Sequence, residues 1–88
     1  MTKKQKAQLL EDLDRVLTNK GWTLDRYGNY IIERNGKKYR MKIQSTSIRY
    51  EVQCVHNDNS KSWVKVRGGY FKDLLITEDG KIQGLKLG

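Results

Sequence analysis

The chain has 88 residues, of which 36% are hydrophobic and 32% charged, with a formal net charge of +8. This composition supports one modest core, so we expect a single domain over residues 1–88. No apolar run approaches the roughly 20 residues that cross a bilayer, and the N-terminal residues lack the apolar segment of a secretory signal. Cys54 is the only cysteine, which excludes an internal disulfide framework and suits a reducing, cytoplasmic location.

Residues 3–19 are predicted to form one amphipathic helix. Apolar residues recur at the spacing of a single buried stripe, namely Leu9, Leu10, Leu13, Val16 and Leu17. Thr2 and Gln5 fit a capping box, in which each side chain accepts a hydrogen bond from the other residue's backbone N–H. Gly21 can adopt the left-handed conformation that ends a helix.

The rest of the chain alternates with period two between turn residues, which predicts antiparallel strands. The expected strands are 22–24, 30–34, 37–43, 48–55, 62–67, 74–77 and 81–87. Asn35-Gly36 predicts a type I′ hairpin turn, Gly68-Gly69 is expected to break a strand, and Asp79-Gly80 to turn the last hairpin. The fold class is therefore α+β: one N-terminal amphipathic helix packed on an antiparallel β-meander of about five or six strands.

The excess positive charge is concentrated in the centre of the chain. Residues 30–67 carry nine cations and three anions, whereas residues 1–29 carry six and four and residues 68–88 carry three of each. Most of the net charge of +8 therefore belongs to the central strands.

A strand register follows from the rule that apolar faces must coincide. We pair Ile43 with Ile48 and Tyr50 with Val66, and expect the helix to cover the resulting apolar face. The opposite face then carries three rows, which are Arg40, Glu51 and Lys65, then Lys38, Gln53 and Trp63, then Lys42, Arg49 and Arg67.

The third row suggests an external anion. Like charges directly opposite one another destabilise a sheet by roughly 0.2–1 kcal/mol per pair, and this row contains no acid. The alternative is a solvated face, because long basic side chains splay into water and are screened by salt. Trp63 lies among these cations. Its flat ring could stack on a nucleic-acid base, or it is a structural residue that covers a sheet edge. The candidate residues for nucleic-acid or partner binding are Lys38, Arg40, Lys42, Arg49, Trp63, Lys65 and Arg67.

The sequence gives little support for a metal site or a catalytic site. One histidine and one cysteine cannot build a closed site of four Cys or His ligands, so we expect no metal and no cofactor. Cys54 alternates onto the apolar face and is expected to be an inert core residue. His56 near Asp58 offers a base and a group to orient it, but at an unspecific spacing. Gly68-Gly69 lacks the Lys-Ser/Thr and the helix of a phosphate loop.

The start of the chain resembles one known family. A helix ending in Lys20-Gly21-Trp22, followed by short strands, is similar to the start of HicA-type mRNA interferases over about residues 7–43. The resemblance implies a small basic fold like that of double-stranded-RNA-binding domains. The family's catalytic histidine follows a glycine near the first strand. Here Asn29 follows Gly28, so no ribonuclease is inferred from the resemblance.

Three functions remain to be compared. The leading hypothesis is a small non-enzymatic protein that binds DNA or RNA, contacting phosphates through the cationic sheet face. The alternative is a phage- or mobile-element-type inhibitor or adaptor that docks the same face onto an acidic surface of a host nuclease or polymerase. The third is a small ribonuclease that depends on His56. A homodimer is also predicted, formed by strand pairing through the last hairpin, Leu74–Leu87.

Overall fold

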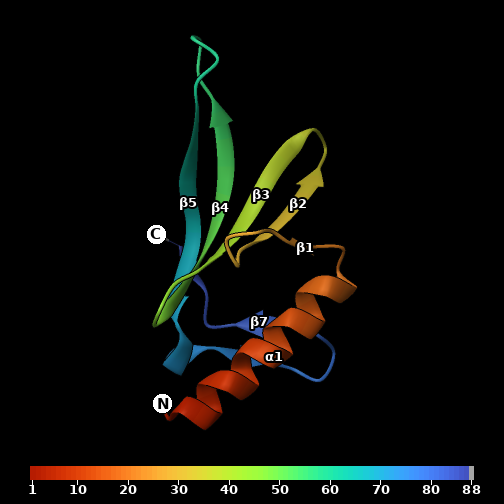
Figure 1. The fold of residues 1–88 in the computed structure, drawn as a ribbon, viewed down its shortest axis with the longest axis vertical. Helices are drawn as coiled ribbons and strands as arrows, with labels where there is room; N and C mark the ends of the chain where they lie inside the picture. The colour runs from red at the N-terminus through yellow and green to blue at the C-terminus, as the bar shows by residue number, and fades with distance from the viewer. Residues whose placement is uncertain (88) are drawn as a thin grey trace.

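The computed structural model describes residues 1–87 and has the expected α+β architecture (Figure 1). Its elements are α1 (Lys3–Asn19), β1 (Thr23–Leu24), β2 (Tyr30–Arg34), β3 (Lys37–Ile43), β4 (Ser47–Val55), β5 (Lys61–Tyr70), a 3₁₀ turn (Phe71–Asp73), β6 (Leu75–Ile76), β7 (Ile82–Gln83) and β8 (Lys86–Leu87). An antiparallel sheet of six strands has the order β1-β2-β3-β4-β5-β8, and β6 and β7 form a second, two-stranded sheet. No helix within residues 1–87 is long and apolar enough to span a bilayer.

Both ends of α1 are fixed by local hydrogen bonds. The Thr2 hydroxyl accepts from the Gln5 N–H at 3.1 Å, and the Gln5 side chain accepts from the Thr2 N–H at 2.9 Å, so the capping box is confirmed. At the other end Gly21 has φ +97°, and the Trp22 N–H donates to the Leu17 carbonyl at 3.0 Å. This is a Schellman ending, and it delivers the Trp22 ring to the core directly after the helix.

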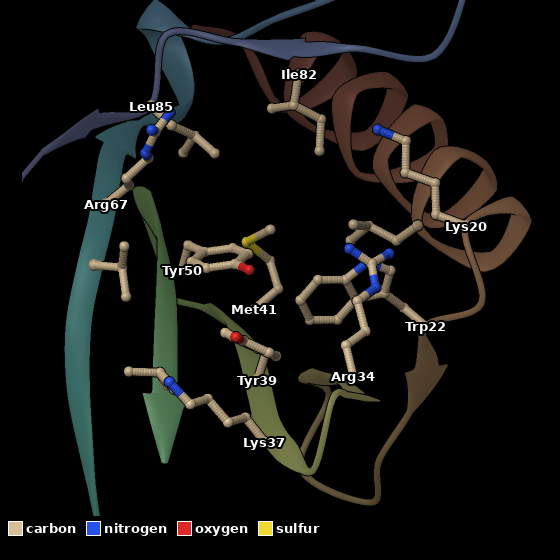
Figure 2. A pocket seen from close by; sticks show the side chains of 13 residues that line it. Lys20, Trp22, Arg34, Lys37, Tyr39, Met41, Tyr50, Arg67, Ile82 and Leu85 are labelled. Atoms are coloured by element: carbon tan, nitrogen blue, oxygen red, sulfur yellow. The ribbon is translucent and has the colours of Figure 1, made fainter. Parts of the chain in front are cut away.

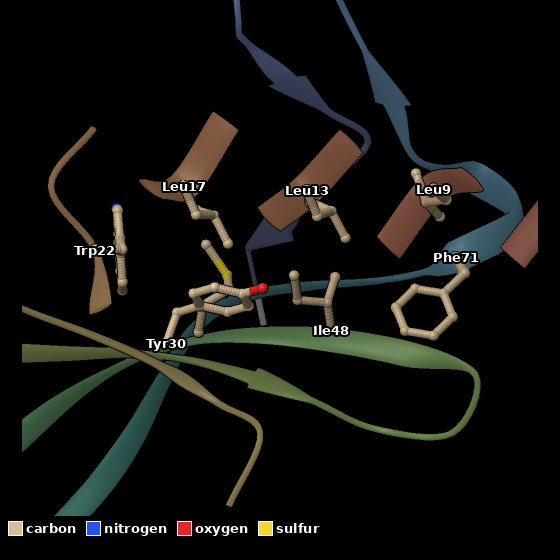
Figure 3. Close-up of a cluster of buried hydrophobic side chains, with 8 residues drawn as sticks. Leu9, Leu13, Leu17, Trp22, Tyr30, Ile48 and Phe71 are labelled. Carbon is tan, nitrogen blue, oxygen red and sulfur yellow. The ribbon is translucent and has the colours of Figure 1, made fainter. Parts of the chain in front are cut away.

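The core lies between α1 and one end of the large sheet (Figure 3). Its buried members are Leu9, Leu13, Leu17, Trp22, Tyr30, Met41, Ile48 and Phe71. Contrary to expectation, the helix does not cover the whole apolar face. The β4–β5 hairpin continues well beyond α1 (Figure 1), and Val64 on it is 47% exposed.

The register of β3 and β4 is confirmed, with Ile43 opposite Ile48. The register of β4 and β5 is confirmed only on one side of a β-bulge at Tyr50 and Glu51. On the other side, from Tyr50 toward Ser47, the predicted pairing of Tyr50 with Val66 is wrong, because Val66 is the extra residue and Arg67 lies opposite Tyr50. One inserted residue reverses the faces of those that follow, so Arg67 points to the helix side of the sheet.

The C-terminal part of the chain also differs from expectation. Gly68-Gly69 does not break β5, which continues to Tyr70. The glycines instead permit close approach, because a Cβ on Gly69 would lie 2.7 Å from the Gly84 carbonyl oxygen. The expected last hairpin is divided, since β6 pairs with β7 while β8 joins the edge of β5. Edge strands as short as β1 and β8 offer little template for a second copy, and the homodimer stays a prediction.

Tyr30 makes stability sensitive to high pH. Burial raises the pKa of Tyr30 well above its usual value, and a 2.6 Å hydrogen bond from its hydroxyl to Asp14 is the second, smaller cause. Because the folded-state pKa is raised, the neutral Tyr30 hydroxyl stabilises the fold. This stabilisation is fully present below the unfolded-state pKa of about 10 and is lost as the pH rises through the folded-state pKa. Between about pH 8 and about pH 11, the free energy of unfolding measured by urea denaturation should fall more for the parent protein than for Tyr30→Phe. Equal losses would contradict the assignment.

Candidate nucleic-acid interface

The outer face, meaning the face of the large sheet turned away from α1, carries six of the seven predicted site residues. These are Lys38, Arg40, Lys42, Arg49, Trp63 and Lys65. Arg67 is the exception, because the β-bulge turns it to the opposite face. The outer face gains Lys86 in exchange, since β8 pairs Lys86 with Gly68, which in turn lies opposite Arg49.

Glu51 organises the arginines of the outer face. Its side chain is buried, with the residue only 2% exposed, and its Oε1 lies 2.7 Å from Arg40 Nη2. Its Oε2 lies 3.5 Å from Arg49 Nε. The predicted row in which a glutamate lies between Arg40 and Lys65 is confirmed. The predicted row of Lys42, Arg49 and Arg67 contained no acid, but Glu51 approaches Arg49 from two residues further along β4 on the same face.

Lys65 replaces Arg67 beside Arg49. A Cβ on Gly68 would lie 2.8 Å from Lys65 Cε and 3.4 Å from its Nζ, so the lysine side chain folds over Gly68. A hollow of about 530 Å³ adjoins this position, and Arg49, Lys65 and Lys86 line it together with Asp73. The predicted row of Lys42, Arg49 and Arg67 is therefore wrong in its third member, because Gly68 lies opposite Arg49 and the Lys65 side chain reaches over it from the neighbouring row.

Trp63 has a cation on its ring. The Arg40 guanidinium carbon lies 4.4 Å from the centre of the Trp63 ring, which is the geometry of a cation–π contact. Trp63 is also half-buried. One part of the ring is therefore engaged by Arg40, and a base could stack only on what remains. Base stacking on Trp63 stays a prediction.

A second surface lies on the helix side of the sheet, which we call the inner groove. It is a recess of about 620 Å³ beyond the end of α1, lined by residues of the helix, the sheet and the C-terminal segment (Figure 2). Aromatic rings form one part of its lining. The Tyr39 and Tyr50 ring centres are 5.7 Å apart with planes tilted by 38°, and Trp22 packs edge-on against Tyr50 at 6.0 Å.

Four cations surround these rings. They are Lys20, Arg34, Lys37 and Arg67, of which Lys20 is the C-cap residue that follows α1 and the others belong to β2, β3 and β5 (Figure 2). No acidic side chain lines the recess, and none of the four forms an ion pair within the part of the chain that the structure describes. Burial and the neighbouring Tyr39 raise the pKa of Tyr50, whereas the positive charges of Arg34 and Arg67 oppose that rise.

The inner groove is not predicted by the sequence pattern as a whole, although the sequence carries part of its signal. Arg34 and Lys37 flank the Asn-Gly turn on the same face as Ile32 and Tyr39, so strict alternation places two cations on an otherwise apolar face. Arg67 could not be assigned in this way because the β-bulge reverses it.

The predicted histidine base has no acidic partner. His56 Nε2 lies 2.8 Å from the Ser62 hydroxyl, whereas Asp58 accepts hydrogen bonds from Ser60, which lower the pKa of Asp58. The expected pair of base and orienting acid is therefore not formed. Cys54 is half-buried and lies outside the core, contrary to expectation. Within residues 1–87 no three His, Cys, Asp or Glu side chains gather as a metal site would require.

Comparison with protein-family models, with curated proteins and with solved structures finds no significant match. The cationic outer face and the inner groove of the chain itself therefore carry any assignment of function.

Proposed function

We propose that this protein is a small, non-enzymatic nucleic-acid-binding protein whose outer face contacts the phosphate backbone. One observation carries the proposal: the strands place seven basic residues on this face and two acids, Glu33 and Glu51. The basic residues are Lys38, Arg40, Lys42, Arg49, Lys61, Lys65 and Lys86. Phosphate contacts of this kind supply affinity and orientation for any sequence.

The seven cations contribute in two ways. Glu51 fixes the guanidinium group of Arg40, which donates to it at 2.8 Å and whose side chain is only 19% exposed. Arg49 Nε lies 3.5 Å from Glu51 and makes no hydrogen bond within the described residues. Fixed guanidinium groups lose little entropy when they bind phosphate, but their charge is partly balanced by Glu51. The lysines lack such a partner within residues 1–87, so we assign most of the counterion release to them.

The salt dependence of binding tests this proposal. Plotted as log K against log salt for duplex DNA, the affinity should fall linearly, and Lys42→Ala or Lys65→Ala should each lower the slope by about 0.9. Lys4→Ala serves as the matched control, because Lys4 is exposed on α1 and should leave the slope unchanged. Fluorescence anisotropy with labelled DNA and RNA provides the measurement. An affinity independent of salt would exclude the proposal.

A protein partner is the second candidate, favoured by exposed apolar residues near the cations. Val55 lies opposite Lys61 on the outer face of the β4–β5 hairpin and is 63% exposed, Val64 on the helix side is 47% exposed, and phosphate binding has no use for either. The protein would then act as a phage- or mobile-element-type inhibitor or adaptor on an acidic host surface. A stoichiometric protein complex that survives nuclease treatment and excludes DNA would favour this candidate over the first.

A further inference from the structure

The size of the inner groove limits what it can bind. Its volume of about 620 Å³ lies within the range of roughly 300–1,000 Å³ that is typical of small-molecule sites. The recess lies between α1, the sheet and the C-terminal segment (Figure 2). A recess of this size can admit single side chains or nucleotides, but it cannot hold the width of a duplex.

The aromatic lining is suited to a flat, apolar ligand. Tyr39 and Tyr50 are both half-buried, so part of each ring is open to the recess. Trp22 is 5% exposed and its edge supports Tyr50, while Met41 contributes apolar floor. Stacking of a base on an aromatic ring is worth roughly 1–3 kcal/mol and tolerates any base, because every base has a π-face.

The charges around the lining require that such a ligand be anionic. Lys20 follows α1, and Arg34, Lys37 and Arg67 come from three different strands, so the positive charge surrounds the recess. With no acid in the lining, this potential is not balanced locally. An aromatic floor within a ring of cations is complementary to a base with phosphates on either side of it.

We propose that the inner groove binds unpaired bases of a single-stranded nucleic acid, with the flanking phosphates against Lys20, Arg34, Lys37 and Arg67. This inference rests on the proposed function and specifies its substrate class. The outer face attracts any polynucleotide through phosphate contacts, whereas the inner groove adds affinity only where a base is free to leave the stack. The protein should therefore prefer single strands to duplexes.

Binding of an oligothymidylate of about 12 nucleotides tests the inference, compared with an abasic oligonucleotide of the same length. The full chain should bind the oligothymidylate about tenfold more tightly than the abasic strand. Tyr39→Leu keeps an apolar side chain but removes the aromatic plane, so it should abolish this difference and leave the abasic affinity unchanged. Tyr39→Phe should retain the difference. Tyr27→Leu is the matched control, because Tyr27 is 73% exposed in a turn outside the inner groove.

The outcomes separate the two proposals. If no oligonucleotide binds in a salt-dependent manner, the proposed function fails. If the abasic strand and the oligothymidylate bind equally well, or if Tyr39→Leu leaves their difference intact, the inner groove holds no base and the outer-face proposal stands alone. Displacement of the oligothymidylate from the inner groove by polyglutamate at lower concentration would overturn the inference in favour of an acidic peptide.

Discussion

Replacing Glu51 with glutamine is expected to lower the free energy of unfolding by about 3 kcal/mol. The carboxylate is buried and partly balances the charge of two guanidinium groups, with Arg40 at 2.7 Å and Arg49 at 3.5 Å. Glutamine keeps the size of the side chain but removes its charge, so two cations that are partly withdrawn from water lose their counter-charge. Removing one partner of a buried pair is costly because the other charges remain desolvated.

Urea denaturation of Glu51→Gln and of a surface control measures this cost. Asp79→Asn is the matched control, because it removes the acid of an exposed pair in which Lys81 lies 3.8 Å away. Exposed pairs contribute about 0–1 kcal/mol, so the control should be nearly neutral. If Glu51→Gln lowers the free energy of unfolding as little as the control does, water already screens the charges of Glu51, Arg40 and Arg49.

The parts of the fold that sequence could predict are those determined locally. Thr2 and Gln5 specify the start of α1 through hydrogen bonds three residues apart, and Gly21 specifies its end. Asn35 and Gly36 both have positive φ, as the predicted type I′ turn requires, and this turn fixes the pairing of β2 with β3. Each of these signals operates within a few residues of the structure that it determines.

The parts that could not be predicted depend on contacts between distant segments. Nothing in the alternation near Val66 indicates an extra residue, yet the β-bulge moves Arg67 to the opposite face of the sheet. Likewise, the burial of Glu51 and its reach to Arg49 require the packed sheet. The inner groove exists because α1 ends before the sheet does, a mismatch in length and direction that no single segment encodes.

Ile48→Ala is expected to have the largest effect on stability, about 3–4 kcal/mol. Ile48 is fully buried at 0% exposure and lies beneath the leucines of α1 (Figure 3), so its truncation loses apolar burial and leaves a cavity. For a domain of this size each kcal/mol lowers the Tm by roughly 4–8 °C, so a fall of about 15–30 °C is expected in thermal unfolding. Val64→Ala, on the uncovered part of the same face, should cost less than about 1 kcal/mol.

The same variant separates stability from binding. The core occupies the end of the sheet that α1 covers, and Ile48 does not line the inner groove. Well below its lowered Tm, Ile48→Ala should therefore bind the oligothymidylate with unchanged preference over the abasic strand. A preference that falls with stability would mean that the inner groove is held in shape by the core, so that the helix and the recess form one cooperative unit. An unchanged preference would mean that the rings of the inner groove are held by the strands and by Trp22, which the Schellman ending of α1 places there independently of Ile48.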